Sequence, residues 1–378
     1  MVRKVTFLVQ WLRSGGAEKQ LLLYATELAR RGYSVTVYCL SYADPHPRIE
    51  ALIDIAKRAG VRIHRAATLF DQVGSLAFKT LRMLLDRSEG FLWVWGMRAE
   101  LLAKALSGKG SKKMIISAQR SANRERLQGD KKLLNWRHER IKAYIANSAC
   151  NIRLLSELVP GTAEKTSVIY NALSEEELAQ EPIKVEATMD RLRVVMLGNI
   201  RMSIKGYDTA LRAVAIARDR GIPVELHIGG RPDEIKLLKQ AVTQNGLDDL
   251  VHYYGEIAEP FPFLRSGNTF LTTSRVEGLS NSLLEAMMIG LPCISTLVAD
   301  TGVFPKEDEH VRCVPIDDPE AIVECWRSFL SNWKGASSMG LRARQMCLDT
   351  LSVKSVVDQI VVVLAGLEGL SRKTSAQL

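Results

Sequence analysis

The sequence lacks the features that mark secreted, membrane-spanning and disulfide-stapled proteins. Its six cysteines are scattered over 378 residues, without the paired spacing of a zinc site or a disulfide framework, which predicts reduced thiols in a cytosolic protein. The richest apolar stretch near the C-terminus, residues 360–367, has about a third of the residues that a membrane span needs. The apolar core at the start covers only residues 5–9, so a secretory signal is not expected.

Three further motifs are missing, and each absence argues against a class of protein. No G-x-G-x-x-G follows a predicted strand, which argues against a Rossmann dehydrogenase. No Asp-x-Asp motif is placed to carry a magnesium ion, so no metal cofactor is expected, and His227 and His252 are interpreted as ordinary strand histidines. Residues 96–135 contain no aromatic side chain, whereas a nucleic-acid-binding protein would interleave aromatic with basic residues. Nucleic acid is therefore not expected as a partner.

The positive charge is concentrated in one part of the chain. The formal net charge is +9, and residues 62–142 hold 18 Lys and Arg against 7 Asp and Glu. Such a concentration suggests an anionic partner for that part of the surface, namely nucleic acid, acidic lipid or a phosphorylated substrate. The alternative is that these basic residues only solvate helix faces.

The first 40 residues predict a strand, a glycine turn, a helix and a second strand. Residues 4–10 form a β-branched and apolar run, which Gly15 and Gly16 interrupt. Residues 18–31 carry apolar side chains at helical spacing, and residues 34–40 are again strand-like. This βαβ order implies a parallel sheet with right-handed crossovers.

The same alternation recurs in two series, separated by an acidic linker with little periodicity at residues 173–190. Trp93 and Trp95 are expected in the core of the first sheet, and a last helix is expected near the C-terminus. Two doubly wound α/β halves are therefore predicted, with ligands bound at the carboxyl ends of the strands. The expected strands are residues 61–64, 91–95, 113–117, 143–147 and 166–170 in the first series, and 193–197, 224–228, 251–254, 269–272, 292–295 and 311–314 in the second.

The most informative motif is TTSRVEGLSNSLLEAMMIGLPCIST, residues 272–296. A strand ends at its start, and a helix is expected to begin near Asn281 or Ser282. Gly278 allows the backbone to approach a ligand closely, and Ser280 or Asn281 suits an N-cap. The first N–H groups of this helix would form a cradle for a pyrophosphate.

Two carboxylates flank this helix N-terminus, because Glu277 precedes it and Glu285 follows eight residues later. As an isolated pair they could be an acid that stabilises the helix dipole and an ordinary surface glutamate. The whole segment, however, resembles the Glu-x7-Glu signature of retaining GT-B glycosyltransferases of the family 4 type. Gly290 and Pro292 match the continuation of that signature.

The resemblance implies a GT-B fold, which is α/β with two Rossmann-like doubly wound parallel-sheet domains facing a cleft. It implies that Glu277 lies against the donor sugar and that Glu285 holds the ribose hydroxyls of the nucleotide. Gly278 would belong to the same donor-binding loop. The backbone amides that would meet the sugar and the diphosphate are those of Leu279, Ser280, Asn281 and Ser282.

Weaker landmarks follow the family order over residues 5–305. Gly15 and Gly16 resemble the first glycine loop, which lines the cleft from the N-terminal domain. Residues 168–173, VIYNAL, resemble the segment that closes that domain, and residues 197–213 resemble the strand and basic turn that open the nucleotide-binding domain.

Three domain boundaries follow from the linker and the resemblance. An acceptor-side N-terminal domain is expected over residues 1–178, and a nucleotide-sugar-binding domain over residues 190–348. The last helix, residues 350–370, is expected to cross back to the N-terminal domain.

The basic turn departs from the family pattern. The usual arginine aligns with Asn199, and Arg201, four residues before Lys205, is expected to supply the guanidinium. Lys205 and Arg201 would then stabilise the leaving diphosphate in place of a metal ion. The alternative for Arg201 is a solvated loop residue.

The acceptor side departs from the pattern too. Many relatives have a cleft histidine after the fourth N-terminal strand, but residues 117–126 contain none. Gln119, Arg120 or Ser121 is expected to line the cleft instead.

These features together predict a retaining glycosyltransferase. It would move a hexose or N-acetylhexosamine from a UDP- or GDP-sugar to a glycan or polyprenyl-diphosphate-linked acceptor, in the biosynthesis of polysaccharide, O-antigen or lipopolysaccharide. The nucleotide-sugar is a substrate, so no cofactor is expected. The alternative is a non-catalytic GT-B-fold subunit that binds or scaffolds within a glycan-assembly complex.

A basic helix suggests where this protein works. Its leucines and tryptophan are mixed with cations, which is typical of a helix lying on an anionic membrane surface. The protein is therefore expected to be cytoplasmic and peripheral at the inner face of the plasma membrane. The residues concerned are Leu127, Leu133, Leu134 and Trp136, with Lys131, Lys132, Arg137 and Arg140.

Overall fold

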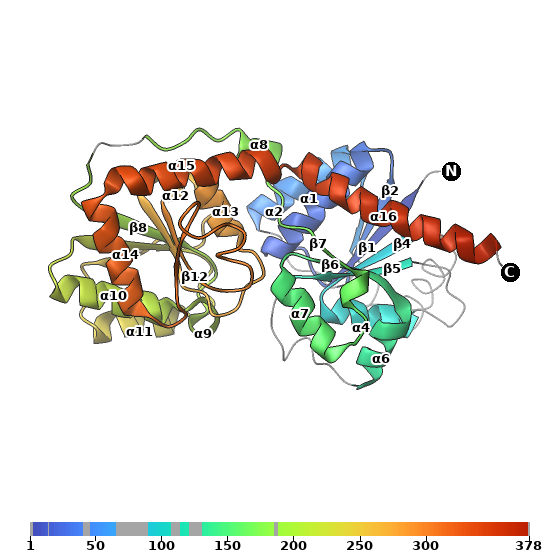
Figure 1. The fold of residues 1–378 in the computed structure, drawn as a ribbon, viewed down its shortest axis with the longest axis horizontal. Helices are drawn as coiled ribbons and strands as arrows, with labels where there is room; N and C mark the ends of the chain where they lie inside the picture. Colours follow the sequence, from blue (N-terminus) through green and yellow to red (C-terminus); the bar gives the residue numbers. More distant parts are fainter. Residues whose placement is uncertain are drawn as a thin grey trace. The chain divides into compact units, whose positions relative to one another are not determined.

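The computed structural model describes residues 3–13, 15–40, 46–65, 90–106, 114–120, 131–184 and 188–376. The chain divides into two compact units (Figure 1), of which the first comprises Met1–Ala172 and Val353–Leu378 and the second Leu173–Ser352. The first of the two segments in the first unit thus runs to Ala172, whereas the expected boundary lies at residue 178. The start of the expected linker packs within the second unit, where Ile183 N–H donates to Ile289 O at 2.8 Å.

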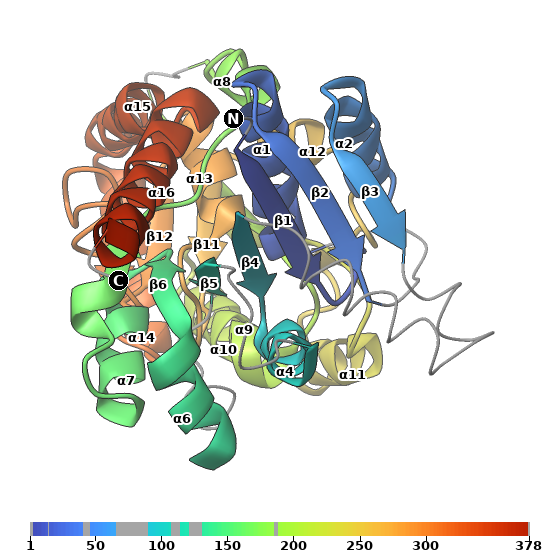
Figure 2. The ribbon, with the colours of Figure 1, turned by 90° about the vertical axis from the view of Figure 1, so that its right-hand side faces the viewer.

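A parallel sheet of seven described strands forms the centre of the first unit, in the order β3-β2-β1-β4-β5-β6-β7. Figure 2 shows β1, β2 and β3 side by side, with α1 and α2 behind them. The strands are β1 (Lys4–Val9), β2 (Ser34–Cys39), β3 (Arg62–Arg65), β4 (Phe91–Trp95), β5 (Met114–Gln119), β6 (Ile141–Ala146) and β7 (Thr166–Val168). The helices are α1 (Gly16–Arg30), α2 (Pro47–Arg58), α4 (Met97–Leu106), α6 (Lys131–Arg140), α7 (Ala149–Leu158), the 3-10 turn η1 (Ala163–Lys165) and the C-terminal α16 (Val353–Ala376).

The centre of this unit is aromatic. All five residues of β4 are buried, because helices cover both faces of a central parallel strand. Trp93 is 0% and Trp95 4% exposed, and the rings of Phe7 and Trp93 stack with centroids 5.1 Å apart. Such rings bury about 150–250 Å² each. The prediction that both tryptophans belong to the sheet core is confirmed.

Helix α16 packs against α1 and is part of the first unit. Its apolar face is buried in the same core as β1 and α1, with Val357, Ile360 and Leu364 each 0% exposed. At the rim, Arg31 donates to Asp358 at 2.6 Å and to Lys354 O at 2.8 Å. The apolar side chains of the last helix are therefore part of the core of the first unit.

The second unit repeats the plan with six described parallel strands in the order β10-β9-β8-β11-β12-β13. Helix α10 (Tyr207–Asp219) follows the first strand of this unit and the basic turn. The strands are β8 (Leu192–Leu197), β9 (Val224–Gly229), β10 (Val251–Tyr253), β11 (Thr269–Thr272), β12 (Cys293–Thr296) and β13 (Arg312–Val314). The other helices are α8 (Glu175–Leu178), α9 (Met202–Lys205), α11 (Ile235–Gln244), α12 (Pro260–Arg265), α13 (Asn281–Met288), α14 (Pro319–Ser331) and α15 (Trp333–Thr350).

In each sheet the strands are added first on one side of the first strand and then on the other. The change of side lies between β1 and β4 in the first unit and between β8 and β11 in the second. The predicted doubly wound α/β fold is therefore confirmed. In such sheets the reversal point, at the carboxyl ends of the strands, is where ligands bind. Among the described residues, no helix is both long and apolar enough to cross a membrane.

Candidate functional site

The loops after β8 and β11 bring together the two residues with the clearest predicted roles. Lys205 ends α9, shortly after β8, and Glu277 follows β11. The Lys205 ammonium forms an ion pair with the Glu277 carboxylate, whose Oε1 also accepts a hydrogen bond from Ser274 Oγ at 3.0 Å. The two side chains are 25% and 18% exposed, so the pair lies at the surface of the site, within reach of a ligand.

Gly206 explains why the basic turn can lie so close to the end of β11. Its φ is +63°, in the left-handed region, and a Cβ at this position would lie 2.1 Å from Thr273 O. Only glycine combines that backbone conformation with so close an approach. Thr273 Oγ1 donates to Lys205 O and Gly206 O, both at 2.9 Å, which ties the end of the turn to the end of β11.

Arg201 precedes α9 as its N-cap residue and is half-buried. Within the described ranges, no residue forms a hydrogen bond or an ion pair with its guanidinium. Arg201 therefore lies on the same short turn as Lys205, but its charge is not taken up by Glu277.

The loop from Gly278 to Ser280 leads into α13 at the carboxyl edge of the sheet. Ser280 is the N-cap, with extended backbone, and its Oγ lies 3.1 Å from Ser282 Oγ. Gly278 and Leu279 are buried, whereas Asn281 is half-buried. The eight-residue helix α13 thus begins after β11, as the turn of Lys205 follows β8, and the N-terminus of a helix suits an anion.

The second acid of the signature is not a surface residue. Glu285 is only 2% exposed, in the middle of α13. The interpretation of Glu285 as an ordinary surface glutamate is therefore wrong. A carboxylate is costly to bury, so a solvated role does not account for its place in this helix.

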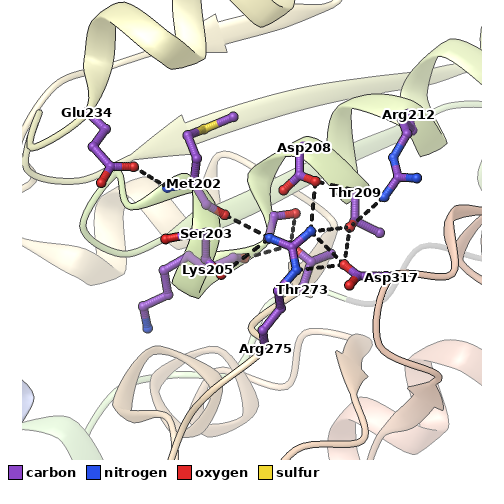
Figure 3. A network of polar contacts seen from close by, with 11 residues as sticks. Met202, Ser203, Lys205, Asp208, Thr209, Arg212, Glu234, Thr273, Arg275 and Asp317 are labelled. Atoms are coloured by element: carbon purple, nitrogen blue, oxygen red, sulfur yellow. Dashed lines mark hydrogen bonds and ion pairs between the residues drawn. The ribbon is translucent and has the colours of Figure 1, made fainter. Parts of the chain in front are cut away.

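Arg275, two residues before Glu277, is a residue of the site that the sequence did not indicate. Figure 3 shows its guanidinium between the carbonyls of the basic turn and the carboxylates of Asp208 and Asp317. The hydrogen bonds that the Arg275 guanidinium donates to the carboxylates of Asp208 and Asp317 raise its pKa. The only sequence signal was its place inside the signature, because its partners lie far away in the chain.

In the first unit, the glycine loop occupies the carboxyl end of β1. Gly15 is the N-cap of α1, with extended backbone, and Gly16 is the first helical residue. A Cβ on Gly15 would lie 1.9 Å from Glu18 Oε2, because this carboxylate folds back over the turn. A side chain at this position would therefore require the Glu18 carboxylate to move.

Gln119 and Arg120, both expected at the acceptor side, differ in their surroundings. Gln119 is 6% exposed, and its amide donates to Ser117 Oγ at 2.7 Å. The guanidinium of Arg120 donates to Asn171 Oδ1 at 2.5 Å and lies 5.1 Å from the centre of the Trp95 ring. Burial lowers the pKa of Arg120. Ser121 lies outside the described residues.

The basic helix α6 is a core helix in its central part. Arg137 is 1% exposed, and its Nε and Nη2 donate to Glu100 Oε2 at 2.9 and 2.7 Å. Leu133 and Trp136 are buried in the same unit. The prediction that these three residues face a membrane is wrong, because α6 covers the sheet and pairs its arginine with a buried carboxylate. Leu127 and the side chains of Lys131 and Lys132 lie outside the described part of the chain.

Three side chains in the second unit could hold a metal ion. The ligand atoms of Glu225, His227 and His252 lie within 4.8 Å of one another, on the adjacent strands β9 and β10. Burial and the neighbouring His252 lower the pKa of His227, which favours the neutral imidazole. Arg191 pairs with Glu225. These three residues lie on the face of the sheet and not at its carboxyl edge. The expectation that no metal is needed stays a prediction.

Comparison with known proteins assigns both units to one family. A family model described as "Glycosyltransferase Family 4" matches residues 14–177, and one described as "Glycosyl transferases group 1" matches residues 191–332. The chain belongs to the group 1, family 4 type of glycosyltransferases.

Relatives of known name match over part of their length. The lipopolysaccharide core biosynthesis glycosyltransferase LpsE of Rhizobium meliloti is 25% identical over 188 residues, which are 50% of this chain and 54% of that protein. The lipopolysaccharide core biosynthesis mannosyltransferase LpsB of the same organism is 29% identical over 100 residues, 25% of this chain and 28% of that protein. The chain thus spans about half the length of the first of these relatives, and less of the second.

A solved structure matches the whole chain in fold. HepE of Anabaena, crystallised with UDP and glucose, has a TM-score of 0.79 at 16% identity, covering 96% of this chain and 100% of that one. The likeness shows that the fold is GT-B.

Proposed function

We propose that this chain is a retaining glycosyltransferase. It moves a hexose or N-acetylhexosamine from a nucleotide-sugar to a glycan or lipid-linked acceptor in polysaccharide, O-antigen or lipopolysaccharide biosynthesis. The observation that carries the proposal is the meeting of Lys205 and Glu277 beside the N-terminus of α13. Membership of the family and the names of its relatives support the same activity.

The charges suit cleavage of a sugar–diphosphate bond. As the bond breaks, negative charge grows on the leaving phosphate and the sugar takes on oxocarbenium character. Lys205 and the first amides of α13 would stabilise the leaving diphosphate, with Arg201 as a second cation on the same turn. Glu277 would lie against the donor sugar, and Glu285 would hold the ribose hydroxyls, as the family signature implies.

Retention follows a front-face course in this proposal. The bond between the anomeric carbon and the phosphate oxygen breaks, and the bond to the acceptor hydroxyl oxygen forms on the same face. The leaving phosphate accepts the proton of that hydroxyl. The reaction then needs no protein base, which agrees with the lack of a histidine in residues 117–126.

The donor is proposed to be a UDP- or GDP-sugar, and the acceptor a glycan or a polyprenyl diphosphate. The crystal structure of HepE with UDP and glucose supports a uridine nucleotide. The names of LpsE and LpsB support an acceptor of the lipopolysaccharide core type. An anionic acceptor would suit the guanidinium of Arg120. The excess of basic residues at 62–142 supports association with an anionic membrane surface, which is also proposed.

A non-catalytic binding or scaffolding subunit is the second candidate. The observation that favours it is Asn199, which stands where the family has an arginine. Such a subunit would bind a nucleoside diphosphate without turning a donor over.

Donor turnover decides between the two. The purified protein is incubated with radiolabelled UDP-glucose, UDP-N-acetylglucosamine and GDP-mannose in the presence of a bacterial lipid extract, and labelled product is counted. Transfer from one donor is expected, and Lys205→Ala should lower the turnover about 10²–10³-fold, by analogy with loss of an oxyanion donor.

The exposed Lys239 is the matched control, and Lys239→Ala should leave turnover within about twofold of wild type. Nucleotide binding without transfer would favour the subunit, and normal turnover in a folded Lys205→Ala protein would refute the site.

A further inference from the structure

We propose that Arg275 is a positioning residue, which fixes the basic turn so that Lys205 meets Glu277 at the donor site. This inference rests on the function proposed above. In the close-up of the site, segment 273–275 runs alongside turn 202–206 (Figure 3).

Segment 273–275 binds five successive carbonyls of the turn. The Arg275 guanidinium donates through Nη1 to Met202 O at 3.0 Å and to Ser203 O at 3.4 Å. The Arg275 backbone N–H donates to Ile204 O at 2.8 Å. The one proton of Thr273 Oγ1 is shared between the next two carbonyls, those of Lys205 and Gly206.

The turn needs these partners because α9 has only four residues. Met202 O accepts the Gly206 N–H at 3.0 Å. The carbonyls of Ser203, Ile204 and Lys205 lie in the last turn, where a helix offers no partner of its own, and they depend on bonds from outside. Lys205 is the last residue of α9, and its ammonium moves with that backbone. The bonds from segment 273–275, with the bond from Met202 N–H to Glu234 Oε2 at 2.7 Å, therefore hold the backbone that carries the ammonium.

The other N–H groups of Arg275 donate to two carboxylates at or near α10. Nε donates to Asp317 Oδ1 at 2.7 Å, and Nη2 to Asp208 Oδ2 at 2.7 Å. The Arg275 guanidinium holds the pKa of Asp317 below its usual value. With its donors committed to the turn and to two carboxylates, Arg275 acts through Lys205 and not on a substrate.

A planar guanidinium is required for this role. It presents five N–H donors in a rigid fork, which here splits between carbonyls on one side and carboxylates on the other. A lysine has three donors on one point charge and cannot span both sides in this geometry. Arg275→Lys should therefore restore the charge but only part of the position.

Arg212 offers a matched control. It shares the same neighbours, since its Nη2 lies 3.2 Å from Thr209 Oγ1 and 3.8 Å from Asp208 Oδ2. No described residue of the turn 202–206 accepts a hydrogen bond from it. Arg212→Gln removes a cation from the same network without loosening the turn.

The first readout is independent of activity. Limited acetylation followed by mass spectrometry measures how fast Lys205 is modified in the folded protein. In Arg275→Gln the rate at Lys205 should rise at least threefold, because the ammonium leaves Glu277, while Arg212→Gln should match wild type. An unchanged rate in folded Arg275→Gln would overturn the proposal.

The second readout is kinetic, with the donor that wild type turns over. Arg275→Gln should lower kcat at least tenfold with a smaller change in KM, and Arg275→Lys should recover part of it. In a Lys205→Ala background Arg275→Gln should cost less than threefold more, because both changes remove the same function. Equal losses in both backgrounds would refute action through Lys205.

Two controls keep the outcomes distinct. If Arg275→Gln does not fold, Thr273→Val removes the two side-chain bonds to Lys205 O and Gly206 O while keeping the β-branched shape, and the same readouts apply. If wild type turns over no donor, the proposed function fails, whereas the acetylation rates still decide whether Arg275 positions Lys205.

Discussion

A pair of glycine substitutions isolates the contact between the basic turn and the end of β11. Gly206 and Gly221 have nearly the same backbone, with φ of +63° and +64°. A Cβ on Gly206 would lie 2.1 Å from Thr273 O, whereas a Cβ on Gly221 has nothing within 4 Å. Gly221→Ala therefore measures the cost of the left-handed backbone alone.

The magnitudes follow from this geometry. A non-glycine residue in the left-handed region costs about 1 kcal/mol, and this is expected for both variants. In Gly206→Ala, relief of the contact to an ordinary 3.4 Å requires a shift of about 1.3 Å. Overpacking of this kind adds about 1–3 kcal/mol. A shift of that size also displaces Lys205, and a misplacement near 1 Å can lower the rate about 10²-fold.

Urea unfolding and donor turnover of the two variants check the reasoning. Gly206→Ala should be less stable than Gly221→Ala by about 1–3 kcal/mol, and only Gly206→Ala should lose at least tenfold in kcat. Equal stability of the two variants, or wild-type kcat in Gly206→Ala, would refute the role of this contact.

Three further outcomes are expected. Arg201→Ala should weaken binding of UDP or GDP more than that of the corresponding monophosphate, as measured by calorimetry. Equal losses for the two ligands would show that Arg201 is a solvated loop residue. Ile360→Ala should lower the free energy of unfolding of the first unit by about 2–4 kcal/mol, measured by hydrogen exchange of its peptides. The control Val362→Ala, at a side chain that is 71% exposed, should change it by less than about 0.5 kcal/mol. The protein should float with anionic vesicles at low salt and not at high salt, and absence of binding at low salt would remove the membrane from the proposal.

Hydrophobic patterning predicted most of the secondary structure. Apolar side chains at helical spacing over residues 18–31 predicted a helix, which the structure has as α1 at Gly16–Arg30. Apolar runs placed the strands to within about two residues. These patterns succeed because each element must bury one face or both faces of its own backbone, which depends on local spacing. The signature at 272–296 then identified the family and the positions of Glu277 and Glu285.

Some predictions failed where a side chain depends on a partner far away in the chain. Arg137 looked like part of a basic surface helix, but Glu100 lies beside it in the fold and makes it a core residue. Composition cannot distinguish a solvated arginine from a paired buried one, because the difference lies in the carboxylate and not in the arginine.

The sequence by itself determined the elements, the doubly wound order and the family, since these follow from local periodicity and contiguous motifs. Only the tertiary structure decided which polar groups meet. Arg275 joins the turn at 202–203 to Asp208 and Asp317, residues brought together by strand order and crossovers. Hydrogen bonds and ion pairs act over about 3–4 Å. Their partners therefore depend on how the sheet and its loops pack, and they cannot be predicted from the residue spacing within one segment.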